Sequence, residues 1–180
     1  MQSSLMADPR NNRGVTLLEC LVTLAVLGIL MSLAAPSFHQ LIMRAQQRVV
    51  VLKLEAAVRL ARHTAIREGR KVLLCPMASE LSFSSGADVV DLACAKDYRT
   101  GVGVWVEADN QWSLLRFWHW PRTVITNRVG DRPVTVKLQF LSNGLSNRNV
   151  TWSVCLGNQN LSLVLNRIGR PVIRKNWGAC

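Results

Sequence analysis

Motifs that mark the common classes of enzyme are missing from this sequence. It contains no Gly-x-Ser-x-Gly nucleophile elbow, no phosphate-binding glycine loop, no His-Glu-x-x-His helix and no acidic EF-hand loop. Its histidines, His39, His63 and His119, stand in dissimilar sequence contexts, and isolated histidines are usually ordinary surface or core residues. We therefore expect no catalytic residue, no cofactor and no small-molecule substrate.

Closely spaced cysteine pairs are also missing. Cys20 lies in an apolar run, and neither the Cys75 to Cys94 gap nor the Cys155 to Cys180 gap gives the Cys-x-x-Cys spacing of a zinc site. Two disulfides fit these four cysteines better and indicate an oxidising compartment. Sequence leaves the pairing open, and we favour Cys75 with Cys94 and Cys155 with Cys180 because each pair closes a local loop.

Acidic residues are scarce, with 11 Asp and Glu against 22 Lys and Arg, for a formal net charge of +11. From Pro121 to Cys180 the only acid is Asp131. Such a balance indicates anionic neighbours, which could be lipid head groups, nucleic acid or acidic protein subunits, although a merely cationic soluble surface is the plainer alternative. The basic residues that we single out as a candidate DNA-binding set are Arg167, Arg170, Arg174 and Lys175.

One long apolar run is present, from Val15 to Ala35. As a helix it would extend about 32 Å, enough to cross a bilayer core. Arg10 and Arg13 precede it, so the positive-inside rule places the N-terminus in the cytoplasm and the rest of the chain across the membrane. A cleaved signal peptide is the alternative, but Glu19 in the run would cost about 2.5 kcal/mol or more in hydrocarbon unless it has a partner.

The remaining chain reads as one helix followed by strands. Between Ser37 and Glu68 there is no glycine or proline, and apolar residues recur every three or four positions, which predicts an amphipathic helix that ends at Gly69. Beyond Arg70 the apolar runs are short and separated by turn residues, which is typical of strands. The expected strands are 72–75, 102–106, 114–120, 134–140, 150–156 and 161–165. The aromatic cluster Phe117, Trp118 and Trp120 could be core or a stacking surface for single-stranded nucleic acid.

The stretch from Arg13 to Glu19, RGVTLLE, resembles the processing site of type IV prepilins. The resemblance implies that a prepilin peptidase cuts after Gly14 and methylates the new N-terminus at Val15. It also implies that Glu19 pairs with the N-terminal amine of a neighbouring subunit during assembly, which would explain a charge in the apolar run. The implied organisation is a leader over 1–14, a transmembrane and assembly helix over 15–36, and a periplasmic domain over 37–180.

Further blocks resemble the FimT/FimU and GspH group of minor pilins and pseudopilins. They are LARHTAIREGR at 60–70, LCP at 74–76, FLSNG at 140–144, VC at 154–155 and NRIGR at 166–170. The resemblance implies an α+β fold, the pilin-like lollipop, in which a long N-terminal helix packs on an antiparallel sheet domain.

That group implies a subunit without enzymatic activity. We expect a minor pilin at the bacterial inner membrane that joins other minor and major pilins and helps to initiate or cap a type IV pilus. Two alternatives are a DNA-binding minor pilin for DNA uptake and a GspH-type pseudopilin of type II secretion. Some FimT-like pilins capture DNA through a Gly-Arg-x-Arg motif, but Gly169-Arg170-Pro171-Val172 lacks the second arginine.

Overall fold

The computed structural model describes residues 16–77, 94–109, 111–156 and 159–180, and only the backbone of residues 33–37. Gly14 and Val15, the expected cleavage and methylation positions, therefore lie outside the described residues. The chain divides into two compact units, Met1–Ile42 and Met43–Cys180. Everything said below of the strands and their core concerns the second unit.

A single helix, α1, extends over Leu17–Glu68, 52 residues. It ends where predicted, because Gly69 adopts a positive φ of 64°, the left-handed conformation that commonly follows a helix. The apolar positions predicted to face the core, Val51, Leu54, Val58, Ala61 and Ala65, are all fully buried. The predicted amphipathic helix is thus confirmed, together with the face that it buries.

The sequence analysis expects residues 15–36 to cross a membrane. In the part of the chain that the structure describes, no helix is both long enough and apolar enough to do so.

Four strands form a first antiparallel sheet in the order β3-β2-β1-β5. They are β1 (Val72–Pro76), β2 (Gly101–Ala108), β3 (Gln111–His119) and β5 (Leu138–Phe140). In β1 four of the five residues are buried, so this strand is covered on both faces and reads as a nearly continuous apolar run. The strand predicted over 134–140 is shorter than expected, because only its last three residues join β1.

A second antiparallel sheet has the order β4-β6-β7-β8. Its strands are β4 (Ile125–Thr126), β6 (Val150–Leu156), β7 (Gln159–Leu165) and β8 (Pro171–Lys175). The expectation of one sheet is therefore corrected to two. Neither β4 nor β8 was predicted. β4 is only two residues long, and β8 begins at a proline and carries charged residues that obscure its alternation of side chains.

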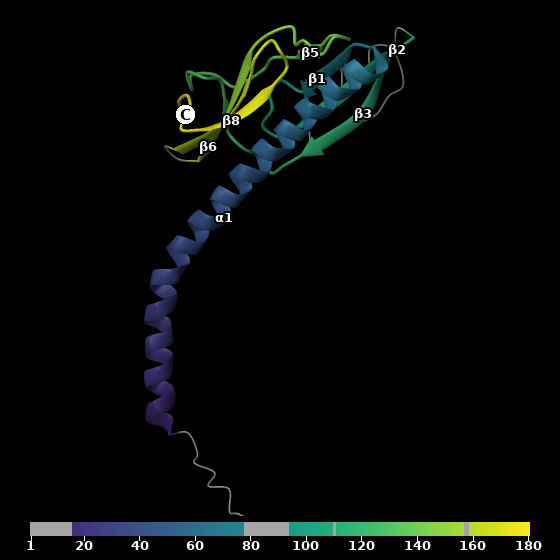
Figure 1. Cartoon of the computed structure of the whole chain (residues 1–180). Helices are drawn as coiled ribbons and strands as arrows, with labels where there is room; N and C mark the ends of the chain where they lie inside the picture. The colour runs from purple at the N-terminus through teal and green to yellow at the C-terminus, as the bar shows by residue number, and fades with distance from the viewer. Residues whose placement is uncertain (1–15, 78–93, 110, 157–158) are drawn as a thin grey trace, which may run out of the picture. The chain divides into compact units, whose positions relative to one another are not determined.

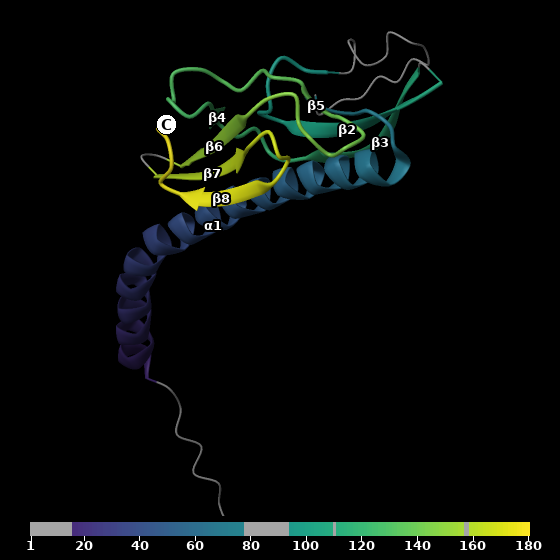
Figure 2. The same ribbon diagram turned by 45° about the horizontal axis from the view of Figure 1, so that its top comes forward.

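The main core lies between α1 and the two sheets. Buried side chains of Val51 and Leu54 from the helix, Leu74 and Val104 from the first sheet, and Leu163 from the second belong to one contiguous cluster. Figure 1 shows the later turns of α1 lying along the strands, and Figure 2 shows β8 beside the helix. A long helix packed on antiparallel sheets confirms the predicted α+β fold class.

Tyr98 occupies the middle of this core and is fully buried. Its hydroxyl donates a hydrogen bond of 2.7 Å to the carbonyl oxygen of Val136, and its ring meets Trp152 edge-on at 5.6 Å between centroids. Because burial disfavours the charged phenolate, the pKa of Tyr98 is raised well above its usual value.

Most of the aromatic residues are structural. Trp105, Trp120 and Trp152 are buried, and Trp118 packs against the main core, with the Arg116 guanidinium 5.1 Å from its ring centroid. Of the aromatic cluster, Trp120 and Trp118 therefore belong to the core, whereas Phe117 is partly exposed and lies beside His119, with 5.8 Å between the ring centroids.

Candidate functional site

Glu19 lies in the first turn of α1. The backbone N–H of Glu19 donates a hydrogen bond of 3.2 Å to the Thr16 hydroxyl oxygen, so Thr16 caps the helix and Glu19 stands three residues beyond it. A carboxylate there is favoured by the helix macrodipole. Among the described residues it makes no ion pair. Within the part of the chain that the structure describes, its negative charge has no cationic partner.

The helix around Glu19 is apolar on every side. Its large apolar side chains between positions 17 and 31 are at least half exposed, among them Leu17, Leu21, Leu24, Val26 and Leu30. A helix that is hydrophobic all round needs burial on all faces, and this unit offers none within itself. The segment therefore exposes apolar surface that its own unit does not cover.

The four basic residues of the C-terminal candidate set do not form one patch. Arg167 and Arg170 lie in the turn between β7 and β8, whereas Arg174 and Lys175 lie at the far end of β8. Four extended residues separate the Cα atoms of Arg170 and Arg174 by about 13 Å. Neighbouring positions in a strand also face opposite ways, and Arg174 pairs with Ser162 while Lys175 pairs with Leu161.

Arg170 joins a groove that it shares with α1. The groove has a volume of about 670 Å³ and is lined by Arg59, Arg62 and His63 of the helix together with Arg170 and Pro171. The helix residues were not recognised as a site from the sequence, because only the fold brings them next to the β7–β8 turn. The i, i+3 spacing of Arg59 and Arg62 was the available signal, since it puts both on one helix face.

Arg174 instead contributes to a stack around Trp177. The Arg174 guanidinium carbon lies 4.5 Å from the Trp177 ring centroid, and that of Arg128 lies 5.0 Å from the same centroid. Stacking on an indole leaves the in-plane N–H groups of a guanidinium available for an anion. The sequence analysis named Arg174 as a site residue but missed Arg128, which is remote in sequence.

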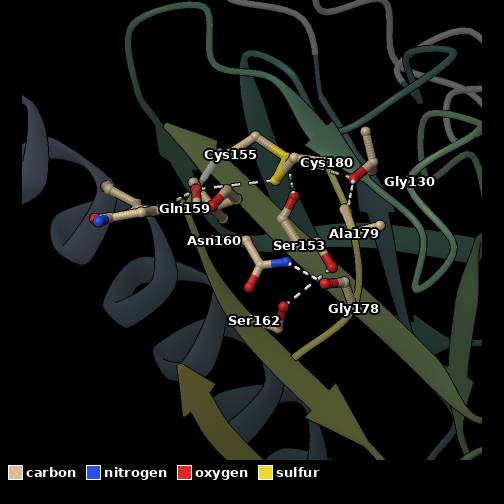
Figure 3. Close-up of a disulfide and its surroundings, with 12 residues drawn as sticks. Gly130, Ser153, Cys155, Gln159, Asn160, Ser162, Gly178, Ala179 and Cys180 are labelled. Atoms are coloured by element: carbon tan, nitrogen blue, oxygen red, sulfur yellow. Dashed lines mark hydrogen bonds between the residues drawn. A yellow bond between two sulfur atoms is a disulfide. The ribbon is translucent and has the colours of Figure 1, made fainter. Parts of the chain in front are cut away.

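A disulfide holds the C-terminal tail that carries Trp177. Cys155 of β6 is bonded to Cys180, and Cys75 of β1 is bonded to Cys94, which are the two pairings favoured in the sequence analysis. Figure 3 shows the tail beside β6 and β7, where the Asn160 amide donates to the Gly178 carbonyl oxygen at 2.8 Å.

Further hydrogen bonds attach the tail to β7 and to the segment that follows β4. The Ala179 N–H donates to the Arg128 carbonyl oxygen at 3.0 Å, and the Ser162 hydroxyl donates to the Trp177 carbonyl oxygen. The stacked arginines are therefore held on a fixed support.

Cys20 lies in α1 and Glu107 lies in β2. Cys20 is exposed and unpaired. The Glu107 carboxylate lies 3.7 Å from the Lys71 ammonium, and no group of metal-binding side chains occurs among the residues that the structure describes.

Comparisons with known proteins identify the family of this chain. Residues 9–35 match the prokaryotic N-terminal methylation motif, and residues 51–169 match the family of type II transport protein GspH. A search of curated proteins finds no significant match.

Among solved structures, two crystal forms of the type IV minor pilin FimU from Pseudomonas aeruginosa strain PAO1 are similar. One is 19% identical, with a TM-score of 0.53 over 76% of this chain and 94% of that chain. The other is 17% identical, with a TM-score of 0.52 over 74% and 96%. At these identities the likeness concerns the fold.

The family is one of structural, non-enzymatic pilins and pseudopilins, whose members are filament components anchored by an N-terminal helix. The long helix, the antiparallel sheets, the methylation motif and a GspH match over most of the chain agree, and this chain belongs to the GspH family of minor pilins and pseudopilins.

Proposed function

We propose that this protein is a minor pilin that helps to initiate or cap a type IV pilus. In this proposal prepilin peptidase cuts the precursor after Gly14 and methylates Val15, and Glu19 pairs with the N-terminal amine of a neighbouring subunit. The observation that supports the proposal is Glu19 itself, a carboxylate that forms no ion pair with the described residues and lies in the first turn of α1, whose apolar side chains between positions 17 and 31 are exposed. Other minor and major pilins are the partners.

The proposal places the precursor at the bacterial inner membrane with residues 37–180 in the periplasm. The exposed apolar side chains of α1 support an anchor, and two disulfides support an oxidising compartment for the strand-rich unit. The anchor and the assembly element are then the same helix, which leaves lipid when it enters the filament.

The presence or absence of the protein in sheared filaments tests this function. Filaments sheared from the wild-type host should contain a tagged copy of the full chain at low abundance, and deletion of the gene should reduce filament number. Processing is checked by the mass of the recovered protein, which should begin at methylated Val15. Replacing Gly14 by Ala should leave the unprocessed mass. Filaments that form in normal number without the protein, and never contain it, would refute the role.

DNA binding is a second candidate, supported by the two arginines stacked on Trp177. The Arg128 and Arg174 side chains share one ring and are fixed by the tail, so their free N–H groups are pre-oriented for phosphate oxygens. Lys175 follows Arg174 in β8, while the missing second motif arginine weighs against capture. A gel shift of the full chain in detergent over a salt series tests it, with Arg174→Gln expected to weaken binding and reduce its salt dependence. Binding that is independent of Arg174 would reject this site.

A pseudopilin of type II secretion is the remaining alternative, supported by the description of the matched family. It would use the same helix and differ in its system. A deletion strain that loses secreted proteins from the medium but keeps its pili would favour it over the pilus role.

A further inference from the structure

The groove between α1 and the β7–β8 turn combines positive charge with apolar walls. Arg59, Arg62, His63 and Arg170 supply the polar groups, while Leu60, Ile66 and Pro171 supply the apolar ones. A volume of about 670 Å³ is within the range of small-molecule pockets, about 300–1,000 Å³, so the groove has room for a few side chains of a partner. All of these residues belong to the unit Met43–Cys180.

The positive charge of this groove is only partly neutralised from within. Arg59 is bound by Glu55, with its Nη2 2.7 Å and its Nε 2.9 Å from one Glu55 carboxylate oxygen. Among the described residues, Arg62 and Arg170 form no ion pair. The Arg62 and Arg170 guanidinium groups therefore reach solvent without a carboxylate from the described residues. A carboxylate bound there would stabilise each of them.

The Arg62 side chain is positioned by backbone groups. Its Nε donates a hydrogen bond of 3.3 Å to the Gly144 carbonyl oxygen, and its terminal N–H groups form no hydrogen bond with the residues that the structure describes. Gly169 packs so closely that a Cβ there would lie 3.0 Å from the Arg62 Cδ and 2.5 Å from the Gly144 oxygen. Arg62 thus has a fixed stem and a free fork, the arrangement that suits two-point binding of a carboxylate.

The lining favours a peptide over nucleic acid. Apart from His63, the described lining residues include no aromatic ring on which a base could stack. The exposed Ile66 and Ile168 side chains beside the groove would instead suit an aliphatic partner side chain.

We propose that this groove binds an acidic segment of a neighbouring pilin subunit, with a carboxylate on Arg62 and Arg170 and an apolar side chain against Leu60 and Ile66. The proposal rests on the proposed function, because it assumes that pilins are the neighbours, and it names the chemistry of one of them. The carboxylates of the bound segment would neutralise part of the positive charge of a chain whose net charge is +11.

Peptide binding by the full chain in detergent micelles tests the proposal. The probe is a fluorescein-labelled peptide of alternating glutamate and leucine, and binding is followed by fluorescence anisotropy. We expect binding that weakens with salt, and about a tenfold loss of affinity for Arg170→Gln, about 1.4 kcal/mol. Arg62→Lys should also lose affinity, because an ammonium keeps the charge but not the fork. The control variant is Arg122→Gln, an exposed arginine that does not line the groove.

Three outcomes would overturn the proposal: no binding of the acidic peptide, equal affinity for Arg170→Gln and Arg122→Gln, or displacement of the peptide by a poly-dT oligonucleotide that binds more tightly through Arg170. Unchanged urea unfolding of the variants shows that they are folded. If wild-type protein is found in sheared filaments and the peptide test fails, only the groove proposal falls. If the wild-type protein is absent from filaments, the proposed function falls instead.

Discussion

Tyr98 shows how one buried side chain makes stability depend on pH. Its folded-state pKa is raised, while in the unfolded chain the phenol ionises near its usual pKa of about 10. Below that pH both states hold the proton, so the stability is fully present. Above it the unfolded chain releases the proton and the folded chain does not, so stability falls by up to about 1.4 kcal/mol per pH unit.

Absorbance near 295 nm measures this directly, because Tyr98 is the single tyrosine of the chain. We expect no tyrosinate signal in the folded protein as the pH passes 10, and a signal that appears only with alkaline unfolding. Tyr98→Phe should lose about 0.5–1.5 kcal/mol at neutral pH, because the Val136 carbonyl loses its donor, and should lose the tyrosine contribution to the alkaline slope. Reversible ionisation near pH 10 without unfolding would contradict the burial of this side chain.

Gly169 is a second residue with a large expected effect on stability, because the fold leaves no room for a Cβ atom there. Its φ of 77° disfavours any side chain, and a Cβ would also collide with the Gly144 carbonyl oxygen at 2.5 Å. Gly69 has a similar φ of 64° but nothing within 4 Å of its Cβ position. We expect Gly69→Ala to cost about 1–2 kcal/mol and Gly169→Ala clearly more, about 2–4 kcal/mol, because overpacking adds to the backbone strain.

Urea unfolding of the two glycine variants separates these contributions. The difference between them reports the close approach of Gly169 to Gly144, since the backbone penalty is common to both. Equal losses for the two variants would show that the β7–β8 turn can move away from Gly144 at little cost.

At the scale of elements, the two disulfides differ in how open they are to reagents. Cys75 is fully buried and Cys94 is partly buried, whereas Cys180 is exposed and Cys155 is partly so. Because thiol–disulfide exchange needs access to a sulfur atom, a mild reductant should open Cys155–Cys180 before Cys75–Cys94. Loss of the crosslink, which joins residues 25 apart, should cost about 3 kcal/mol.

Alkylation followed by mass mapping checks the order of reduction. Early labelling of Cys155 and Cys180, with Cys75 and Cys94 still protected, is the expected result, and the always free Cys20 serves as the internal standard. Simultaneous labelling of all four would show that the tail is protected as well as the core.

Some elements of the fold could be predicted from the sequence, and others could not. The helix over 37–68 and its buried face followed from spacing alone, because burial against one core imposes a helical period. The split into two sheets did not, since strand neighbours such as β1 and β5 are chosen by tertiary packing. Likewise, Arg170 was found as a basic residue, but its meeting with Arg62 depends on the long-range contact of Gly144 with Gly169. A local pattern cannot contain that contact.

On the scale of the whole molecule, the chain divides its tasks between a helix that lacks internal cover and a unit with its own core. The N-terminal part of α1 exposes apolar side chains and the Glu19 carboxylate, and the later part is buried against the sheets. This division is consistent with assembly through the N-terminal helix while the strand-rich unit presents the groove and the stacked arginines.

The most direct test of this account is the recovery of Glu19→Ala protein in sheared filaments, compared with wild type and with Thr23→Ala, another exposed polar position on α1. We predict that the Glu19 variant is cleaved normally, as its mass will show, but is reduced at least about tenfold in filaments, since about 1.4 kcal/mol or more of pairing is lost. Thr23→Ala should be recovered as wild type. Normal recovery of the cleaved Glu19 variant would contradict the proposed pairing of Glu19 with a neighbouring N-terminus.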